Sequence, residues 1–154
     1  MSYIKARNHL RLYNLDDRVI EFDTSTATVE LAAKALGVTE GEIAKSLSFI
    51  VNNQPILVIV AGDKKIDNHK YKEEFKVKAK MISFDDVESL IGHKAGGVCP
   101  FGINKNVLVY LDESLKQYEY IYPACGTSNT AVKLLITELE LTSNYVKWVN
   151  VCKE

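Results

Sequence analysis

The chain has 154 residues and is 47% hydrophobic, which provides enough apolar material for the core of one domain spanning residues 1–154. Its formal net charge of -1 argues against a protein that coats nucleic acid non-specifically. No apolar run reaches 18 residues and the first residues lack the apolar segment of a signal peptide, so we expect a cytoplasmic protein without membrane association.

The charge is unevenly distributed along the chain. Between residues 64 and 80, seven lysines accompany three acidic residues, so this segment carries a net charge of +4 and the rest of the chain -5. A local lysine cluster suits a moderate, salt-sensitive contact with phosphate groups. An ordinary solvated helix face explains the same residues equally well.

The first half of the chain predicts helices with recognisable ends and a β-hairpin. The hydroxyl residues at 24–26 are candidate N-caps for a helix that Gly37 ends. Thr39 and Glu42 have capping-box spacing and open a short helix, which places Lys45 at a helix-to-strand junction. The elements expected here are a helix over 2–12, a turn over 14–17, a strand over 19–22, a helix through 29–36, and strands over 47–51 and 56–61 that pair around an NNQP turn.

The second half of the chain predicts more strands, separated by short helices. Many strands without regular βαβ alternation indicate an α+β fold with a mixed, largely antiparallel sheet. The elements expected here are helices near 68–76, 84–91 and 112–116, a short helix opened by Thr137 and Glu140, and strands over 80–83, 107–112, 118–124, 130–136 and 145–151.

A glycine-rich loop, GHKAGGVCPFG, spans residues 92–102 and holds four of the eight glycines. Gly96 and Gly97 can adopt positive φ angles and let a ligand approach the backbone, and Pro100 fixes the chain at the loop's exit. Such a loop can direct N–H groups at a carbonyl oxygen that becomes negative during ester hydrolysis. A structural turn is the alternative explanation for these glycines.

A second polar loop, CGTSN, spans residues 125–129 between two predicted strands. Thr127, Ser128 and Asn129 supply hydroxyl and amide groups suited to recognition of a ribose or an amino acid. The same residue types are also common turn formers. Two loops of this kind could line one cleft.

Lys45 is the only lysine between Lys34 and Lys64, and apolar residues surround it in the sequence. A partly desolvated ammonium group could hold a substrate carbonyl, a phosphate or a terminal ribose. The alternative is a side chain that extends from a helix end to reach water.

Three stretches occur in a specific order: LGVTEGEIAKSLSF, GHKAGGVCPFG, and ACGTSNTAVKLLITEL followed by WVNV. Together they resemble the YbaK-type deacylases and the editing domain inserted in some bacterial prolyl-tRNA synthetases, over roughly residues 20–151. The resemblance implies a mixed, barrel-like sheet with short surrounding helices, Lys45 in the family's key lysine position, and both glycine loops beside the site. It departs from the family at Cys99, where many relatives have serine.

The resemblance implies a water-based reaction, and we expect no cofactor and no metal. The resemblance implies no covalent enzyme intermediate, and the loops contain no obvious carboxylate or histidine base, so we expect a ribose hydroxyl or the substrate itself to assist the attacking water. The predicted catalytic residues are Lys45, Gly96 and Gly97, and the predicted substrate-binding residues are Val98, Cys99, Pro100, Phe101, Gly102, Gly126, Thr127, Ser128 and Asn129.

The function expected from this reading is trans-editing, in which the aminoacyl ester of a mischarged tRNA is hydrolysed. The expected substrate is Cys-tRNA or Ala-tRNA of the proline type, and the expected partners are mischarged tRNA and prolyl-tRNA synthetase. One alternative is a non-catalytic module that binds a tRNA acceptor end or a synthetase. Another is hydrolysis of a small ester or thioester without RNA.

Two chemical alternatives involve the cysteines. Cys99 could attack an ester as a thiolate, with His93 six residues before it as the base. A zinc site built from His93, Cys99 and Cys125 is the other, but the spacing matches no familiar pattern.

Overall fold

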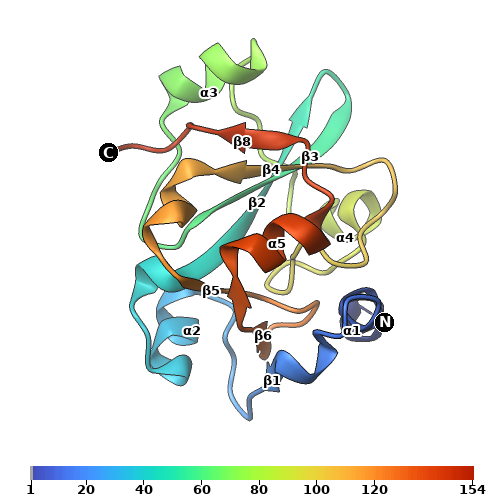
Figure 1. The fold of residues 1–154 in the computed structure, drawn as a ribbon. Helices are drawn as coiled ribbons and strands as arrows, with labels where there is room; N and C mark the ends of the chain where they lie inside the picture. The colour runs from blue at the N-terminus through green and yellow to red at the C-terminus, as the bar shows by residue number, and fades with distance from the viewer. Residues whose placement is uncertain (1) are drawn as a thin grey trace.

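The computed structural model describes residues 2–154, which form an α+β fold built on a mixed six-stranded sheet (Figure 1). The strands lie in the order β7-β5-β2-β3-β4-β8, and the twisted sheet curls into an open half-barrel. A separate antiparallel pair, β1 with β6, lies below it in the view of Figure 1. The strands are β1 (Val19–Glu21), β2 (Ile43–Val51), β3 (Gln54–Ala61), β4 (Leu108–Asp112), β5 (Tyr120–Pro123), β6 (Thr130–Val132), β7 (Leu134–Leu135) and β8 (Lys147–Val149).

The pairing confirms the expected α+β class and the mixed, barrel-like sheet. Within the six-stranded sheet, β2 with β3 and β5 with β7 are antiparallel. The pairs β2 with β5, β3 with β4, and β4 with β8 are parallel. Parallel pairing thus takes a larger share of this sheet than the sequence suggested.

The hairpin of β2 and β3 fixes which way each residue of β2 faces. Asn52 and Asn53 have φ angles of 48° and 67°, as a two-residue hairpin turn requires, and Val51 pairs with Gln54. Because the pair that closes a two-residue turn is hydrogen-bonded, odd-numbered residues of β2 direct their N–H and C=O groups at β3, and even-numbered residues direct theirs away from it. Pro55 lies opposite Ile50, where β3 donates no hydrogen bond to β2, so its missing N–H is tolerated.

Short helices surround the sheet, and several of the predicted ends are confirmed. Gly37 caps α2 in the left-handed conformation with φ 73°, and Thr39 and Glu42 form the expected capping box. The N-cap of α2 was predicted wrongly: it is Thr28, whose side chain accepts from the N–H of Leu31, and not a residue of 24–26. The helices are α1 (Ser2–Arg11), α2 (Val29–Leu36), α3 (Asn68–Phe75), α4 (Val87–Ile91) and α5 (Ile136–Ser143), with 3-10 segments at Asp16–Arg18, Glu40–Glu42 and Glu113–Gln117.

Other boundaries also differ from the prediction. The stretch 130–136 is not one strand: β6 pairs with β1, and β7 pairs with β5. Strand β2 begins at Ile43, so Lys45 lies within the strand and not at a helix junction. The segment expected as a strand at 80–83 contributes only an isolated bridge, Phe49 with Met81. In the described part of the chain, no helix has the length and apolar character needed to cross a bilayer.

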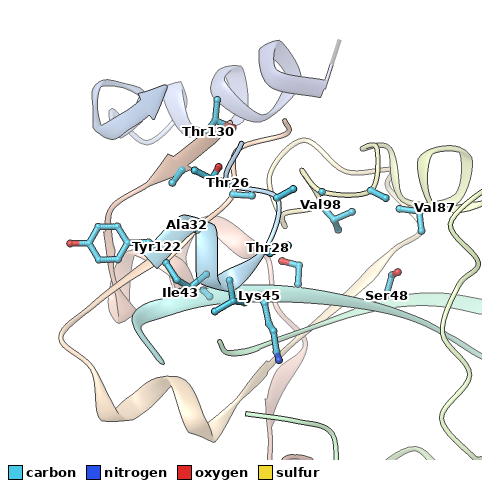
Figure 2. Close-up of a pocket in the computed structure, with 18 of the residues that line it drawn as sticks. Thr26, Thr28, Ala32, Ile43, Lys45, Ser48, Val87, Val98, Tyr122 and Thr130 are labelled. Atoms are coloured by element: carbon cyan, nitrogen blue, oxygen red, sulfur yellow. The ribbon is translucent and has the colours of Figure 1, made fainter. Parts of the chain in front are cut away.

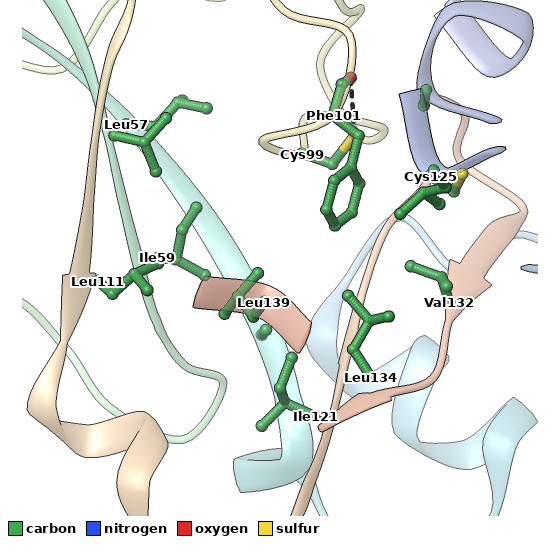
Figure 3. Close-up of a cluster of buried hydrophobic side chains, with 14 of the residues drawn as sticks. Leu57, Ile59, Cys99, Phe101, Leu111, Ile121, Cys125, Val132, Leu134 and Leu139 are labelled. Atoms are coloured by element: carbon green, nitrogen blue, oxygen red, sulfur yellow. Dashed lines mark hydrogen bonds between the residues drawn. The ribbon is translucent and has the colours of Figure 1, made fainter. Parts of the chain in front are cut away.

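Two apolar clusters lie on opposite faces of the sheet. The larger cluster is covered by α1, α4 and α5 and contains Ala44, Leu57 and Ile59 (Figure 3). The smaller cluster contains Phe49 and packs under α3. Alternation of side chains along β2 explains this division, because residues 44 and 49 point to different faces.

Candidate functional site

A cavity of about 340 Å³ lies beside β2, where the sheet has a gap in its pairing (Figure 2). Strand β5 pairs with β2 only at Ile43 and Ala44. Further along, the N–H of Ile82 donates to the C=O of Ser48 at 3.0 Å. Between these contacts β2 has β3 on one side and the cavity on the other. The cavity wall is contributed by residues 26–29, 32, 43–46, 48, 81–82, 84, 87, 95–96, 98, 122, 124 and 130–131.

Lys45 lines this cavity, as its predicted role requires, but its ammonium group is directed past β2, away from Thr28 and Val98 (Figure 2). Odd-numbered residues of β2 face the smaller apolar cluster, which explains this direction. In this conformation Nζ therefore points away from Val98 of the first glycine loop.

The pKa of Lys45 is lowered chiefly because its surroundings desolvate the ammonium group. The charge of Lys65 acts in the same direction, whereas Cys152 and Asp63 oppose the shift. The ammonium is thus partly withdrawn from water at the cavity wall.

Gly96 and Gly97 have different surroundings. Gly96, with φ 94°, lines the cavity, as does Val98. No group of residues 2–154 accepts a hydrogen bond from the N–H of Gly96 or of Val98. In contrast, the N–H of Gly97 donates to the C=O of Lys94 at 3.0 Å, and its own C=O accepts from the N–H of Gly126 at 3.0 Å. Gly97 therefore joins the two glycine loops, whereas the backbone N–H groups of Gly96 and Val98, two residues that line the cavity, donate to no described residue.

The next four residues of the loop do not border this cavity. Cys99 and Phe101 have no exposed surface and belong to the larger apolar cluster (Figure 3). Pro100 lines a separate cavity, next to His9. Gly102 lies against α1, where an added Cβ would be 2.6 Å from the backbone oxygen of Lys5.

The 125–129 loop borders a second cavity, of about 710 Å³. Gly126, Thr127 and Ser128 line it together with Lys5 and Lys94, and Ala95 belongs to the walls of both cavities. Asn129, the last residue of this loop, holds the loop in place: its side-chain amide donates to the C=O of Phe22 at 3.0 Å.

The buried cysteines and His93 form no site at either of these two cavities. The Sγ of Cys99 lies 3.5 Å from Nε2 of His93, and that nitrogen is 2.6 Å from the C=O of Phe101. Burial raises the pKa of Cys99, so its nucleophilic thiolate form is strongly disfavoured. Within residues 2–154, no three or more His, Cys, Asp or Glu side chains are grouped in a way that would hold a metal ion.

Several lining residues were not predicted from the sequence. Small and hydroxyl side chains dominate the wall, and among the described lining residues Lys45 is the only side chain charged at neutral pH. For Ser46 and Ser48 the sequence did contain a signal: two serines at alternate positions directly after Lys45, in a strand that is otherwise apolar. The hydroxyl residues that the sequence reading missed are Thr26, Thr28, Ser46, Ser48 and Thr130.

Known proteins resemble this chain over its whole length and over parts of it. Its sequence is 46% identical to the uncharacterized protein YwhH of Bacillus subtilis, with 100% of this chain and 99% of that protein covered. It is 29% identical to an Enterococcus faecalis protein named "Putative Cys-tRNA(Pro)/Cys-tRNA(Cys) deacylase EbsC", covering 70% of this chain and 66% of that protein. It is 32% identical to the proline--tRNA ligase of Aquifex aeolicus, covering 57% of this chain but only 16% of the ligase.

Solved structures share the fold closely. The crystal structure of "a putative trans-editing enzyme for prolyl tRNA synthetase" superposes with a TM-score of 0.89 at 27% sequence identity, covering 99% of this chain and 98% of that one. The sequence pattern described as the aminoacyl-tRNA editing domain matches residues 23–141. That match includes β2, both glycine loops and most of the cavity wall. The chain belongs to the aminoacyl-tRNA editing domain family.

Proposed function

We propose that this protein is a trans-editing hydrolase that cleaves the aminoacyl ester of a mischarged tRNA. The observation that supports the proposal is the cavity in the gap beside β2, whose wall includes Lys45, Gly96 and Val98, with the N–H groups of Gly96 and Val98 donating to no described residue. Membership of the editing family supports tRNA as the substrate, and the proline-specific relatives support a tRNA of the proline type. The same relatives support prolyl-tRNA synthetase as a partner.

The size and lining of the cavity favour a small aminoacyl group. Its volume of about 340 Å³ is at the lower end of ligand pockets, which span ~300–1,000 Å³. Alanine residues 27, 32, 44, 95, 124 and 131 line it. Alanyl and cysteinyl esters are therefore the proposed substrates, because a larger side chain would compete for space with the terminal ribose.

The proposed reaction is attack of water on the ester carbonyl. The N–H groups of Gly96 and Val98 stabilise the negative oxygen of the tetrahedral intermediate. Because the lining residues include no Asp, Glu or His, a hydroxyl of the terminal ribose assists removal of the proton from water. Collapse of the intermediate breaks the bond to the ribose oxygen, which takes up a proton, and releases the free amino acid.

Lys45 has a positioning role in this scheme. Its four-carbon stem starts at the cavity wall, and rotation of this stem brings the ammonium to the phosphate or ribose of an incoming acceptor end. The seven lysines of residues 64–80 add a longer-range attraction for the tRNA.

The test is a panel of purified tRNAs charged with alanine, cysteine or proline. Release of free alanine or cysteine, with proline retained on its tRNA, is the expected result. Lys45→Ala should lower the rate by roughly 100-fold or more while the melting temperature is unchanged. Lys105→Ala, which removes an exposed lysine from the loop before β4, is the matched control. Protection of every ester from hydrolysis would identify a non-catalytic tRNA-binding module instead.

A further inference from the structure

The gap beside β2 leaves the backbone of one residue, Ser46, facing the cavity. Even-numbered residues of β2 direct their N–H and C=O groups away from β3, as the C=O of Ser48 shows by accepting from Ile82. Ser46 precedes this contact by two residues and follows the last pairing with β5, at Ala44. Within residues 2–154 its N–H and C=O have no strand opposite them. Unpaired backbone groups at a cavity wall are strong hydrogen-bonding sites for a ligand.

The side chain of Ser46 also lacks a partner. Its Oγ is buried and makes no hydrogen bond with any described residue. Two other hydroxyls of the cavity are engaged: Thr26 Oγ1 donates to the C=O of Ser128 at 3.2 Å, and Thr28 Oγ1 accepts from the N–H of Leu31 at 3.2 Å. A buried hydroxyl without a partner is costly, and rotation about one side-chain bond can turn a serine hydroxyl towards a ligand beside its own backbone.

We propose that Ser46 recognises the unsubstituted α-amino group of the aminoacyl ester, using its backbone C=O and its hydroxyl as acceptors. This inference rests on the proposed function and narrows its substrate class. An α-amino group, with a pKa of about 7.7–8.0, is a donor at neutral pH and needs acceptors. The described lining residues include no carboxylate, so carbonyl and hydroxyl oxygens are the acceptors that the cavity offers.

The position of Ser46 suits the chemistry of the ester. In an aminoacyl ester the amino group is attached to the carbon next to the scissile carbonyl. Ala95, Gly96 and Val98 line the same cavity, so we expect a group held at β2 by its nitrogen to place its carbonyl near this part of the wall. N-acylated esters, such as peptidyl-tRNA, lose the amino donors and add bulk at this point. The site therefore selects esters of free amino acids.

A binding experiment with non-hydrolysable analogues tests the inference without requiring turnover. Alanyl-adenosine with an amide in place of the ester, and its N-acetyl derivative, are titrated into protein labelled with ¹³C and ¹⁵N. The free-amine analogue should shift the carbonyl resonance of Ser46, and the N-acetyl derivative should bind roughly 100-fold more weakly. Equal binding of the two analogues would overturn the proposal. Amine-dependent binding without hydrolysis of any aminoacyl-tRNA would support it and reject the hydrolase assignment.

Two serine variants separate the hydroxyl's contribution from the general shape of the cavity. Ser46→Ala should reduce the preference for the free-amine analogue by roughly 10-fold, because one acceptor is lost. Ser48→Ala removes another hydroxyl from the cavity wall and should keep the preference, because the C=O beside that hydroxyl already accepts from Ile82 and the two cannot hold the amino group together. Ser46→Thr keeps a hydroxyl and should restore the preference if Ser46→Ala folds poorly. If folded Ser46→Ala prefers the free-amine analogue as strongly as the unmodified protein does, the hydroxyl of Ser46 does not bind the amino group.

Discussion

The N–H of Gly126 donates a 3.0 Å hydrogen bond to the C=O of Gly97, and this contact joins the two glycine loops at the site. The approach is so close that a Cβ on Gly97 would lie 2.5 Å from the carbonyl carbon of Gly126. The loop that carries the proposed oxyanion donors is therefore held in place by the 125–129 loop.

Gly97→Ala should both destabilise the protein and reduce deacylation. The methyl group would collide with backbone atoms, so the two loops must separate, at an expected cost of about 2–3 kcal/mol in the free energy of unfolding. Gly37→Ala is the control, because φ is 73° there but no atom lies within 4 Å of the added Cβ. Its cost should be about 1 kcal/mol, without an effect on turnover. Urea unfolding and single-turnover deacylation measure the two effects. Equal losses of unfolding free energy in Gly97→Ala and Gly37→Ala would contradict the close contact between Gly97 and Gly126.

Cys99→Ser should retain deacylase activity. Cys99 has no exposed surface, and burial raises the pKa of its thiol, so it does not act as the nucleophile. A serine hydroxyl can donate to the same C=O of Phe101 that the thiol approaches at 3.7 Å, and the change in stability should stay near about 1 kcal/mol. A loss of activity with intact folding would restore the thiol mechanism. Alkylation by iodoacetamide, followed by mass spectrometry, should label Cys99 only in unfolded protein.

The free energy of unfolding should fall as the pH is lowered below about 6.5, partly because of His93. Burial is the main cause that lowers the pKa of His93, and the charge of Lys5 adds to it, whereas the hydrogen bond to Phe101 opposes the shift. Below the unfolded-state pKa the unfolded chain binds this proton more readily, so stability is lost from about pH 6.5 down to the lowered pKa.

His93→Gln should flatten this pH dependence, because glutamine does not titrate. Urea unfolding at pH 7, 6 and 5 measures the slope. His69→Gln on α3 is the control, since its side chain is 82% exposed. A slope in His93→Gln as steep as that of the unmodified protein would assign the effect to other groups.

Lys80→Gln should weaken tRNA binding in a salt-dependent way. Lys80 is exposed and immediately precedes Met81, which lines the cavity, so we expect its ammonium to contact a phosphate of an acceptor end that enters there. Loss of one phosphate contact lowers the slope of log K against log salt by about 1. Filter binding at several salt concentrations measures this slope. Lys105→Gln should leave it unchanged, and identical slopes for all three proteins would exclude the contact.

Local signals in the sequence predicted much of the fold. Gly37 caps a helix, Thr39 and Glu42 form a capping box, and Asn52 and Asn53 form the hairpin turn, because each depends on residues that are neighbours along the chain. The division of residues 130–136 between two sheets was not predictable in this way. Which partner strand takes each half is decided by packing of distant segments and not by local alternation.

The sequence predicted some of the residues that border the cavity, but not the directions in which their side chains point. Lys45 and Gly96 do border one cavity, but the direction of the lysine follows from the hairpin register, which inverts every side chain with a shift of one residue. The loop after Val98 turns into the core, so Cys99 and Phe101 are buried where the sequence suggested contact with a substrate. Nothing in the order of glycines distinguishes a loop that stays at the surface from one that enters the core.

Strands with exposed backbone groups invite neighbouring molecules to add a strand of their own, which is a common route to aggregation. In β2 the exposed stretch is only 45–47, blocked at one end by β5 and at the other by the segment that contains Met81. Of these three residues only Ser46 directs its N–H and C=O away from β3, so a passing polypeptide finds the backbone groups of one residue, too few to form a ladder. This edge of the sheet can therefore bind a ligand the size of a single amino acid but cannot pair with a strand of another polypeptide.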